Sequence, residues 1–366
     1  MNDGMVQLNK VTKTYGTFQL DCSMEVSPGM ATGFVGANGA GKTTTFQILL
    51  GLVPPETGGI RIFGKTYTEL TAKDRERIGV SLADSGFSQF LTVRDVTAIL
   101  RNLYTRFDED RFLEKCQQYE LLANKKIKDF STGMQAKLKL LIAMSHDADL
   151  LILDEPTLGL DVMSREAMLE ELQEYLDSEG TGGAPRSVLI SSHISSDLEK
   201  FCDDIYMIDR GKIVLHEETD VLLDSYGILK VDERQYQALD RRYLLAGMRE
   251  AYGYRLLTNE RRYYQENYPE LVMEKGSIDD ILILTARGEA MKGLLTKDFR
   301  ILAGQKRYFT IIILIAAIFL CSGQPAQIIV GYCTMFGMLF TVNTISYDEF
   351  DHGYLFLFTL PVTRKD

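Results

Sequence analysis

Three glycines, a lysine and a threonine stand close together in an eight-residue stretch, Gly36-Ala-Asn-Gly-Ala-Gly-Lys-Thr43. The spacing fits the phosphate-loop pattern G-x-x-x-x-G-K-[ST], in which the glycines let successive backbone N–H groups turn toward phosphate oxygens. Lys42 would add a mobile positive charge, and the Thr43 hydroxyl would ligate Mg²⁺. The stretch therefore predicts a site for the phosphates of a nucleotide. The residues expected to bind them are Gly36, Asn38, Gly39, Gly41, Lys42, Thr43 and Thr44.

Two carboxylates follow an apolar run further along the chain, in Leu150-Leu-Ile-Leu-Asp-Glu155. At the end of a strand, Asp154 is suited to holding Mg²⁺ through water, and Glu155 to orienting or deprotonating an attacking water. A third stretch, Ser131-Thr-Gly-Met-Gln135, precedes a helical segment and offers a hydroxyl and backbone N–H groups to an anion. By itself, this third stretch is also compatible with an ordinary helix cap.

The elements that must position these groups alternate between strands and helices. A short apolar strand, Met30–Val35, leads into the glycine-rich loop, and a helix, Thr44–Leu50, leaves it. Further strands are expected at Val6–Val11, Phe18–Val26, Ile60–Phe63, Leu150–Leu153 and Ser187–Ile190, with a helix at Ser164–Ser178. The pattern predicts an α/β fold with a mixed, largely parallel sheet, an N-terminal antiparallel β subdomain and a helical insertion between residues 91 and 149. In that insertion, the spacing is mostly helical and places Leu100, Leu103, Tyr104 and Phe107 on one helix face.

Residues 217–290 have a different composition, rich in arginine and tyrosine. Their aromatic residues alternate with apolar ones, which favours a small packed α+β appendage, although such tyrosines can also stack on nucleic-acid bases. Residues 291–366 are different again, with two apolar runs that predict transmembrane helices at about 308–322 and 327–345. Basic residues precede the first run and no charge lies between the runs, so both outer flanks are expected in the cytoplasm. The alternative is a pair of buried core helices.

Composition narrows the classes of partner. The net charge is −11 and no basic stripe is evident, which disfavours binding to nucleic acid. The five cysteines and four histidines do not cluster, so no metal site is expected beyond a nucleotide-bound Mg²⁺. The N-terminus lacks a basic region followed by an apolar one, so we expect no signal peptide and a cytoplasmic location up to about residue 290.

Taken in order, these stretches resemble the ATPase subunit of ABC transporters over roughly residues 5–215. Gly36–Thr43 resembles the Walker A motif, and Leu150–Asp154 the Walker B motif with the catalytic Glu155 after it. Phe130–Gln135 resembles the signature motif and retains Ser131, Gly133 and Gln135. Leu158–Asp161 resembles the D-loop, and Ser191-Ser-His193 the switch histidine. Tyr15 stands where family members stack an aromatic ring on adenine.

One position departs from the family pattern. Family members usually carry a glutamine that contacts Mg²⁺ at the end of Ile78-Gly-Val-Ser-Leu-Ala-Asp84, where this chain has Ala83 and Asp84. Because a carboxylate coordinates Mg²⁺ as well as an amide does, our hypothesis is that Asp84 takes part of that role.

The resemblance implies an ATP hydrolase that uses Mg²⁺, with Lys42, Glu155 and His193 as catalytic residues. It also implies a second ATPase subunit, most simply in a homodimer, whose signature residues close over the nucleotide. The residues assigned to nucleotide contacts through the resemblance are Tyr15, Ser131, Gly133, Gln135 and Asp161, and those assigned to the metal are Thr43, Asp154 and Asp84.

The tail resembles the opening of a bacterial efflux permease, so three parts are expected: an ATPase domain at 1–216, an accessory segment at 217–290 and a permease-like segment at 291–366. The implied function is the motor of an ABC exporter at the cytoplasmic face of the membrane, working with a membrane permease. Two alternatives stay open: a soluble ABC-type ATPase with no transport role, and a membrane-bound nucleotide sensor. The sequence does not select the exported substrate.

Overall fold

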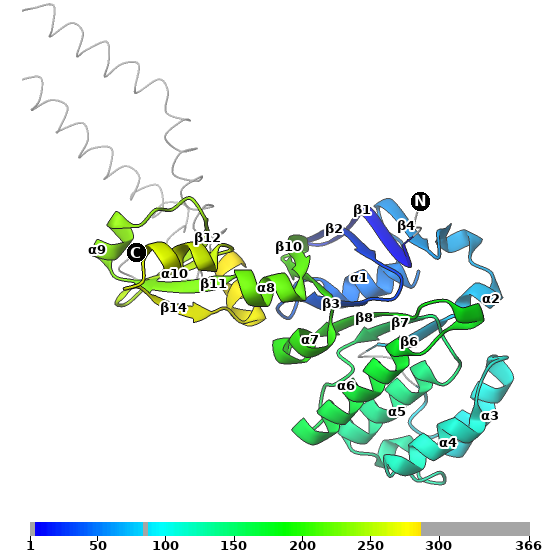
Figure 1. Ribbon diagram of the computed structural model, residues 1–366. Helices are drawn as coiled ribbons and strands as arrows, with labels where there is room; N and C mark the ends of the chain where they lie inside the picture. The colour runs from blue at the N-terminus through cyan, green and yellow to red at the C-terminus, as the bar shows by residue number, and fades with distance from the viewer. Residues whose placement is uncertain (1–3, 83–86, 287–366) are drawn as a thin grey trace, which may run out of the picture. The chain divides into compact units, whose positions relative to one another are not determined.

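The computed structural model of the chain describes residues 4–82 and 87–286. The first part is a ten-stranded sheet in the order β5-β4-β1-β2-β10-β9-β3-β8-β7-β6 (Figure 1). Its strands are β1 (Val6–Tyr15), β2 (Phe18–Val26), β3 (Ala31–Val35), β4 (Thr57–Ile62), β5 (Lys65–Thr66), β6 (Ile78–Ser81), β7 (Leu150–Asp154), β8 (Ser187–Ser192), β9 (Asp204–Asp209) and β10 (Lys212–Glu218). Its helices are α1 (Lys42–Leu49), α2 (Ala72–Arg75), α3 (Val93–Leu103), α4 (Glu109–Gln118), α5 (Thr132–Met144), α6 (Val162–Asp177), α7 (Ser195–Phe201) and α8 (Thr219–Ser225).

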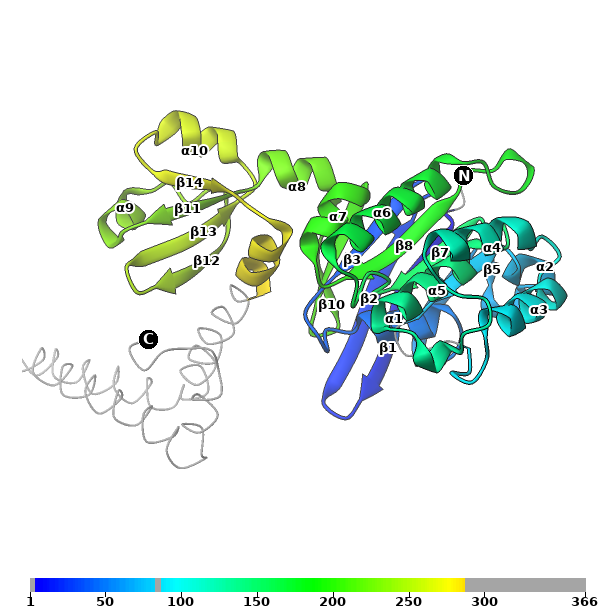
Figure 2. The ribbon, with the colours of Figure 1, turned by 90° about the horizontal axis from the view of Figure 1, so that it is seen from below.

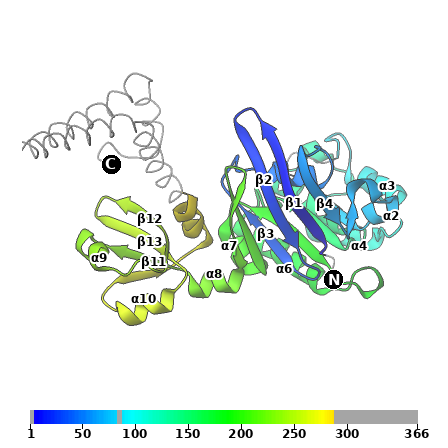
Figure 3. The same cartoon turned by 90° about the horizontal axis from the view of Figure 1, so that it is seen from above.

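The strands from β9 to β6 run parallel to one another. Strands β1, β2, β4 and β5 form an antiparallel part, of which β1, β2 and β4 are labelled in Figure 3. This arrangement confirms the predicted mixed sheet. Strands β3, β7 and β8 are buried along their whole length, because helices cover both faces of the parallel part (Figure 2). In β7, Ile152 packs in the same core as Phe46 of α1, and its neighbour Leu153 packs in the other core with Leu172 of α6. The alternation of these side chains thus fixes the strand between two helical layers.

The helical insertion contains α3, α4 and α5. Helix α3 starts at Thr92, which accepts a hydrogen bond from Asp95 N (3.2 Å) while the Asp95 carboxylate accepts one from Thr92 N (2.8 Å). The expected common helix face is wrong beyond Leu103, and within the helix Leu100 is buried while Leu103 is 60% exposed. The helix ends at Leu103 and Tyr104 has extended backbone, so the helical spacing does not continue to Phe107.

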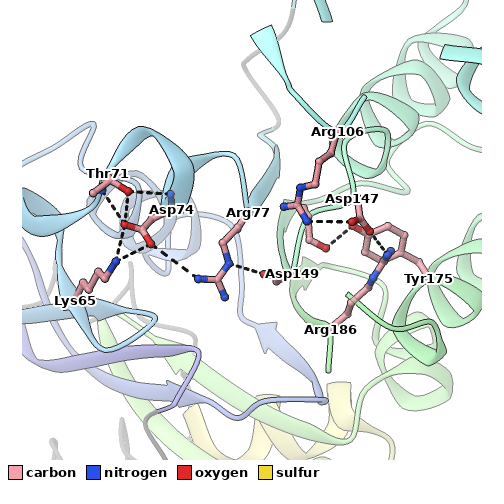
Figure 4. A network of polar contacts seen from close by, with 10 residues as sticks. Lys65, Thr71, Asp74, Arg77, Arg106, Asp147, Asp149, Tyr175 and Arg186 are labelled. Atoms are coloured by element: carbon pink, nitrogen blue, oxygen red, sulfur yellow. Dashed lines mark hydrogen bonds and ion pairs between the residues drawn. The ribbon is translucent and has the colours of Figure 1, made fainter. Parts of the chain in front are cut away.

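Polar contacts join α2 to the N-terminal ends of β6 and β7 (Figure 4). Asp74 accepts hydrogen bonds from Lys65 and Thr71, which hold the pKa of its carboxyl well below the usual range. Arg77, one residue before β6, pairs with the fully buried Asp149, one residue before β7. A separate cluster lies at the same edge, with Asp147 paired to both Arg106 and Arg186. Each of the three carboxylates therefore has a cationic partner at the edge of the sheet.

The second sheet is antiparallel, in the order β12-β13-β11-β14. Its elements are β11 (Gly227–Val231), α9 (Glu233–Ala238), β12 (Leu244–Glu250), β13 (Gly253–Thr258), α10 (Arg261–Asn267), β14 (Val272–Lys275) and a helix that begins at Ile278 and is described through Ala286. The tyrosines here pack mainly on one another: Tyr264 is fully buried, and the rings of Tyr236 and Tyr254 stack at 4.0 Å. Strand β10 continues to Glu218, past the expected boundary after residue 216.

Within residues 4–82 and 87–286, no helix combines the length and the apolar character that crossing a membrane requires. Both expected spans, at about 308–322 and 327–345, lie outside the described residues.

Candidate nucleotide-hydrolysis site

The glycine-rich loop connects the buried strand β3 to the N-terminus of α1. A Cβ atom on Gly36 would lie 2.4 Å from the carbonyl oxygen of Ile208, so only glycine fits at the first position of the loop. Gly39 and Gly41 have φ angles of 80° and 117°, in the region that favours glycine. The tight turn of the loop backbone therefore depends on these glycines. A phosphate-binding loop needs such a turn, because its N–H groups must point toward the phosphate oxygens.

Lys42 is the first residue of α1, and only 6% of it is exposed. Its Nζ atom donates a hydrogen bond to the carbonyl oxygen of Gly36 (2.6 Å) and lies 3.5 Å from Oε1 of Glu155. The ammonium group is thus held across the loop, next to the carboxylate that the sequence assigns to hydrolysis. Positive charge at the mouth of the loop is what the phosphates of a nucleotide need.

A cavity of about 560 Å³ opens over this loop. Its volume falls within the usual range for small-molecule sites. Tyr15 and Asn38, both expected to contact nucleotide, lie in its wall. The full lining consists of Tyr15, Phe18, Ala37, Asn38, Gly39, Gly41, Lys42, Thr43, Thr44, Gln47 and Glu155. The residues from the first strand, the loop, α1 and the end of β7 therefore share one pocket.

Two of the three expected metal ligands, Thr43 and Asp154, meet at the edge of this pocket. Thr43 Oγ1 donates a hydrogen bond to Oδ2 of Asp154 (2.8 Å), and Ser191 Oγ donates one to Oδ1 of the same carboxylate (2.6 Å). Asp154 is 1% exposed. A hydroxyl and a carboxylate are hard oxygen ligands of the kind Mg²⁺ prefers. The residues present thus fit a magnesium ion beside the phosphate loop, which Thr43 and Asp154 would hold.

Glu155 and His193 form the other polar pair of the site. Both the backbone N–H and the Nδ1 atom of His193 lie within hydrogen-bond distance of Oε2 of Glu155, at 3.0 and 2.6 Å. Glu155 has a φ angle of 51°, uncommon for a residue other than glycine, and its N–H donates to Ser191 Oγ (3.0 Å). Because of this turn of the backbone, the two consecutive carboxylates point to different partners. Asp154 contacts Thr43, and Glu155 lies between Lys42 and His193.

The remaining residues assigned through the resemblance lie outside this cavity. Ser131 caps α5 by accepting a hydrogen bond from Met134 N (3.2 Å), and Asp161 caps α6 by accepting one from Ser164 N (3.0 Å). That bond is the main cause of the lowered pKa of Asp161. The amide of Gln135 donates to the carbonyl oxygens of Ile127 and Phe130, at 3.4 and 3.3 Å.

The two glycines of these segments approach each other closely. A Cβ on Gly133 would lie 3.1 Å from the carbonyl oxygen of Gly159. The signature segment and the D-loop are therefore packed together. Asp84, the last of the assigned metal ligands, lies outside the described residues.

Sequence reasoning missed a structural role for Ser191, which contacts both carboxylate residues. The signal was present but weak: Ser191 belongs to β8, which lies between β3 and β7, and it is paired in register with Asp154. Phe18 and Gln47 in the cavity wall were also missed. Phe18 reads as an ordinary strand residue and Gln47 as a helix residue, and only the assembled fold brings them to the pocket.

A glycine-rich loop between a parallel strand and a helix, with carboxylates at the end of a nearby parallel strand, defines a P-loop nucleotide hydrolase. Comparison with known proteins narrows this class. The family described as ABC transporter matches residues 20–158, and the family described as ABC-2 family transporter protein matches residues 293–366.

Similar curated proteins include the Nod factor export ATP-binding protein I of Cupriavidus pinatubonensis, 33% identical over 60% of this chain and 68% of that protein. The linearmycin resistance ATP-binding protein LnrL of Bacillus subtilis is 31% identical over 57% of this chain and 68% of that protein. Among solved structures, an ATP-binding cassette described as dimeric, in a post-hydrolysis state bound to ADP and Pi, superposes with a TM-score of 0.52. It shares 23% identity, covers 59% of this chain and 99% of that one, and shows the fold alone.

The chain belongs to the ATP-binding subunits of ABC transporters, and the relatives named above place it with those of exporters. It is therefore an ABC-type ATPase that uses Mg²⁺ and ATP and works with membrane permease components. Its ATPase domain acts in the cytosol, in association with the membrane.

Proposed function

We propose that Lys42, Glu155 and His193 carry out ATP hydrolysis in this chain and that Thr43 and Asp154 hold the magnesium ion. The observation that supports this most strongly is that two pairs of polar side chains meet at one loop. Thr43 contacts Asp154 at 2.8 Å, and Lys42 lies 3.5 Å from Glu155. The first pair, Thr43 and Asp154, offers oxygen ligands to a metal. The second pair places the positive charge of Lys42 beside the carboxylate of Glu155, which can accept a proton.

Bound Mg²⁺ would neutralise charge on the phosphate oxygens during transfer. Lys42 adds a second positive charge from the loop. Glu155 accepts hydrogen bonds from His193 through Oε2, while its other carboxylate oxygen, Oε1, lies 3.5 Å from Nζ of Lys42. Oε1 would orient the attacking water and take its proton beside that positive charge. His193 thereby fixes the direction in which Glu155 acts. Much of the catalysis is then positioning by a preformed set of side chains.

We infer that the working unit is a dimer. Ser131, Gly133 and Asp161 lie on capped helix ends outside the cavity, so they serve a nucleotide only if a second copy brings them over the loop. The dimeric cassette with the same fold supports this arrangement. Bound ATP would then favour the closed dimer, and hydrolysis would reopen it.

We further propose three parts in the chain: the ATPase domain at 1–216, an accessory segment at 217–290 and a membrane segment at 291–366. The match of residues 293–366 to the ABC-2 transporter family supports the third part. Spans at about 308–322 and 327–345 would anchor the chain in the membrane that the permease crosses. Alkaline extraction of membranes from cells that express the full chain tests this, because an unanchored chain would be released.

The substitution Glu155→Gln tests the proposed chemistry. We expect ATP binding to be retained and phosphate release to fall by at least about a hundredfold, because the amide cannot accept the proton of the attacking water. A dimer should accumulate with ATP, visible by size-exclusion chromatography. Glu166→Gln is a matched control, since Glu166 is an exposed carboxylate of α6 that pairs with Lys200 (3.2 Å). Wild-type phosphate release in Glu155→Gln would refute the proposed role of Glu155.

A further inference from the structure

Helix α7 begins two residues after His193. The position of its first turn therefore constrains the position of the loop that carries this histidine. The residue at the N-cap is Ile194, which has no side chain able to cap the helix. Ser195, the first helical residue, directs its hydroxyl away from the helix. Its Oγ donates a hydrogen bond to Oδ2 of Asp279 (2.8 Å), in the helix that begins at Ile278.

A second polar contact and an apolar surface join the same two helices. Glu199 of α7 accepts a hydrogen bond through Oε1 from the backbone N–H of Ile278 (3.0 Å). This contact binds one of the N–H groups that a helix leaves free at its N-terminus. The fully buried side chains of Ile278, Ile281 and Leu284 lie in one core cluster with Leu198, Phe201 and Cys202. Two hydrogen bonds and a shared apolar core therefore join α7 to the helix at 278–286.

The segment after Glu155 and helix α6 also contact α7. Oδ2 of Asp197, in the first turn of α7, accepts a hydrogen bond from Thr157 Oγ1 (3.0 Å) and lies 3.7 Å from Nε of Arg165. Thr157 is two residues after Glu155, and Arg165 belongs to α6. The first turn of α7 is thus tied both to the segment that carries Glu155 and to Asp279.

We propose that Asp279 is a positioning residue for ATP hydrolysis, acting through Ser195 on the loop that carries His193. The proposal rests on the proposed function, in which His193 orients Glu155. Asp279 anchors Ser195, Ser195 fixes the start of α7, and the start of α7 fixes the backbone N–H of His193. That N–H and Nδ1 of the same residue are the two groups that hold Oε2 of Glu155.

A small displacement here matters because a catalytic carboxylate must be held within a fraction of an ångström of its productive place. Without the bond to Asp279, α7 would still pack through its apolar side, but its first turn would lose one of its two polar anchors. We therefore expect a loss in kcat and little change in nucleotide affinity, because none of these residues lines the cavity.

The test compares variants of the full chain. Asp279→Ala and Ser195→Ala should each lower kcat about fivefold, a modest loss because Asp279 is exposed to solvent. The double variant should lose no more than either single one, since both changes remove the same bond. Asp279→Asn keeps an oxygen that accepts from Ser195, and it should restore most of kcat. KM for ATP should stay within about twofold in all of them.

Asp280 supplies the matched control. Its carboxylate bonds to Ser277 (2.8 Å) and Arg255 (2.7 Å), both in the part of the chain after residue 226, and no bond from it to α7 is described. Asp280→Ala should lower the melting temperature at least as much as Asp279→Ala and leave kcat unchanged.

Two results would overturn the proposal: wild-type kcat in Asp279→Ala while Glu155→Gln is inactive, or an equal loss of kcat in Asp280→Ala. Wild-type turnover in Glu155→Gln would instead remove the proposed function itself.

Discussion

Ser191 offers the sharpest test of how the hydrolysis site is held together. Its hydroxyl donates to Oδ1 of Asp154 (2.6 Å) and accepts from the N–H of Glu155 (3.0 Å). It thus contacts the expected metal ligand and the expected general base at once, from a strand that lies between β3 and β7. Replacement by alanine removes both hydrogen bonds and leaves the strand and its backbone pairing intact.

The two bonds differ in what their loss costs. Asp154 is a 1% exposed carboxylate, so water cannot easily replace the lost donor. A hydrogen bond to a buried charge contributes about 1.5–3 kcal/mol. The N–H of Glu155 stays paired, because it also reaches the carbonyl oxygen of Ser191 at 3.2 Å. Thr43 still holds Oδ2 of Asp154, so we expect the lower end of that range. If the whole loss appears in the transition state, kcat falls about tenfold.

The assay measures steady-state phosphate release across a series of Mg²⁺ concentrations, together with unfolding by urea. Ser191→Ala should lower kcat and raise the Mg²⁺ concentration that gives half-maximal activity. Ser187→Ala is the matched control on the same strand. Ser187 is also fully buried and has two hydrogen bonds, but to the neutral backbone groups of Ser27 (3.1 Å) and Gly29 (2.9 Å). It should cost stability without changing the dependence on Mg²⁺. Equal Mg²⁺ profiles for both variants would refute the reasoning.

Two further predictions concern a charge in the site and a buried histidine outside it. Lys42→Ala should weaken binding of a fluorescent ATP analogue at least tenfold, because it removes a buried cation from the loop, and an unchanged dissociation constant would contradict this. His146 is 2% exposed and stacks on Tyr104 at 3.9 Å, and burial lowers its pKa below 6.5. Near pH 6 the unfolded chain therefore binds a proton that the folded chain does not. As the pH is lowered from about 6.5, the free energy of unfolding should decrease by at most about 1.4 kcal/mol per pH unit. Urea unfolding of His146→Phe should show a shallower dependence on pH, and equal slopes would rule the effect out.

Much of the site could be predicted because its polar residues stand in short contiguous stretches of sequence. The loop at Gly36–Thr43 carries its own backbone geometry in the glycine spacing, and Asp154 and Glu155 follow an apolar run that reads as a buried strand. For such stretches the local sequence and the final structure impose the same requirement. The pairing of Thr43 with Asp154 then follows from two strands, β3 and β7, that end at the same edge of the parallel sheet with β8 between them.

What could not be predicted depends on contacts between distant segments. Strands β9 and β10 were not anticipated, although they complete the centre of the sheet. The expected helical face failed at Leu103, because the helix ends there and the spacing alone cannot show where a helix stops. The contact between Ser195 and Asp279 joins residues 84 positions apart. Neither residue stands out in the sequence, since a serine after a strand and an aspartate in a helix are common.

The contacts of Glu155 link the phosphate loop to helix α7. Glu155 is tied at once to the phosphate loop through Lys42 and to the loop before α7 through His193. Its left-handed backbone, with a φ of 51°, leaves little freedom to follow one of these segments without the other. A movement of α7 must therefore change either the His193 contact or the Lys42 contact. Two hydrogen bonds, from Ser195 to Asp279 and from Ile278 to Glu199, join α7 to the helix at 278–286, which precedes the permease-like tail in sequence. Under the proposed roles of Glu155 and His193, a movement of that helix would therefore reach the hydrolysis site.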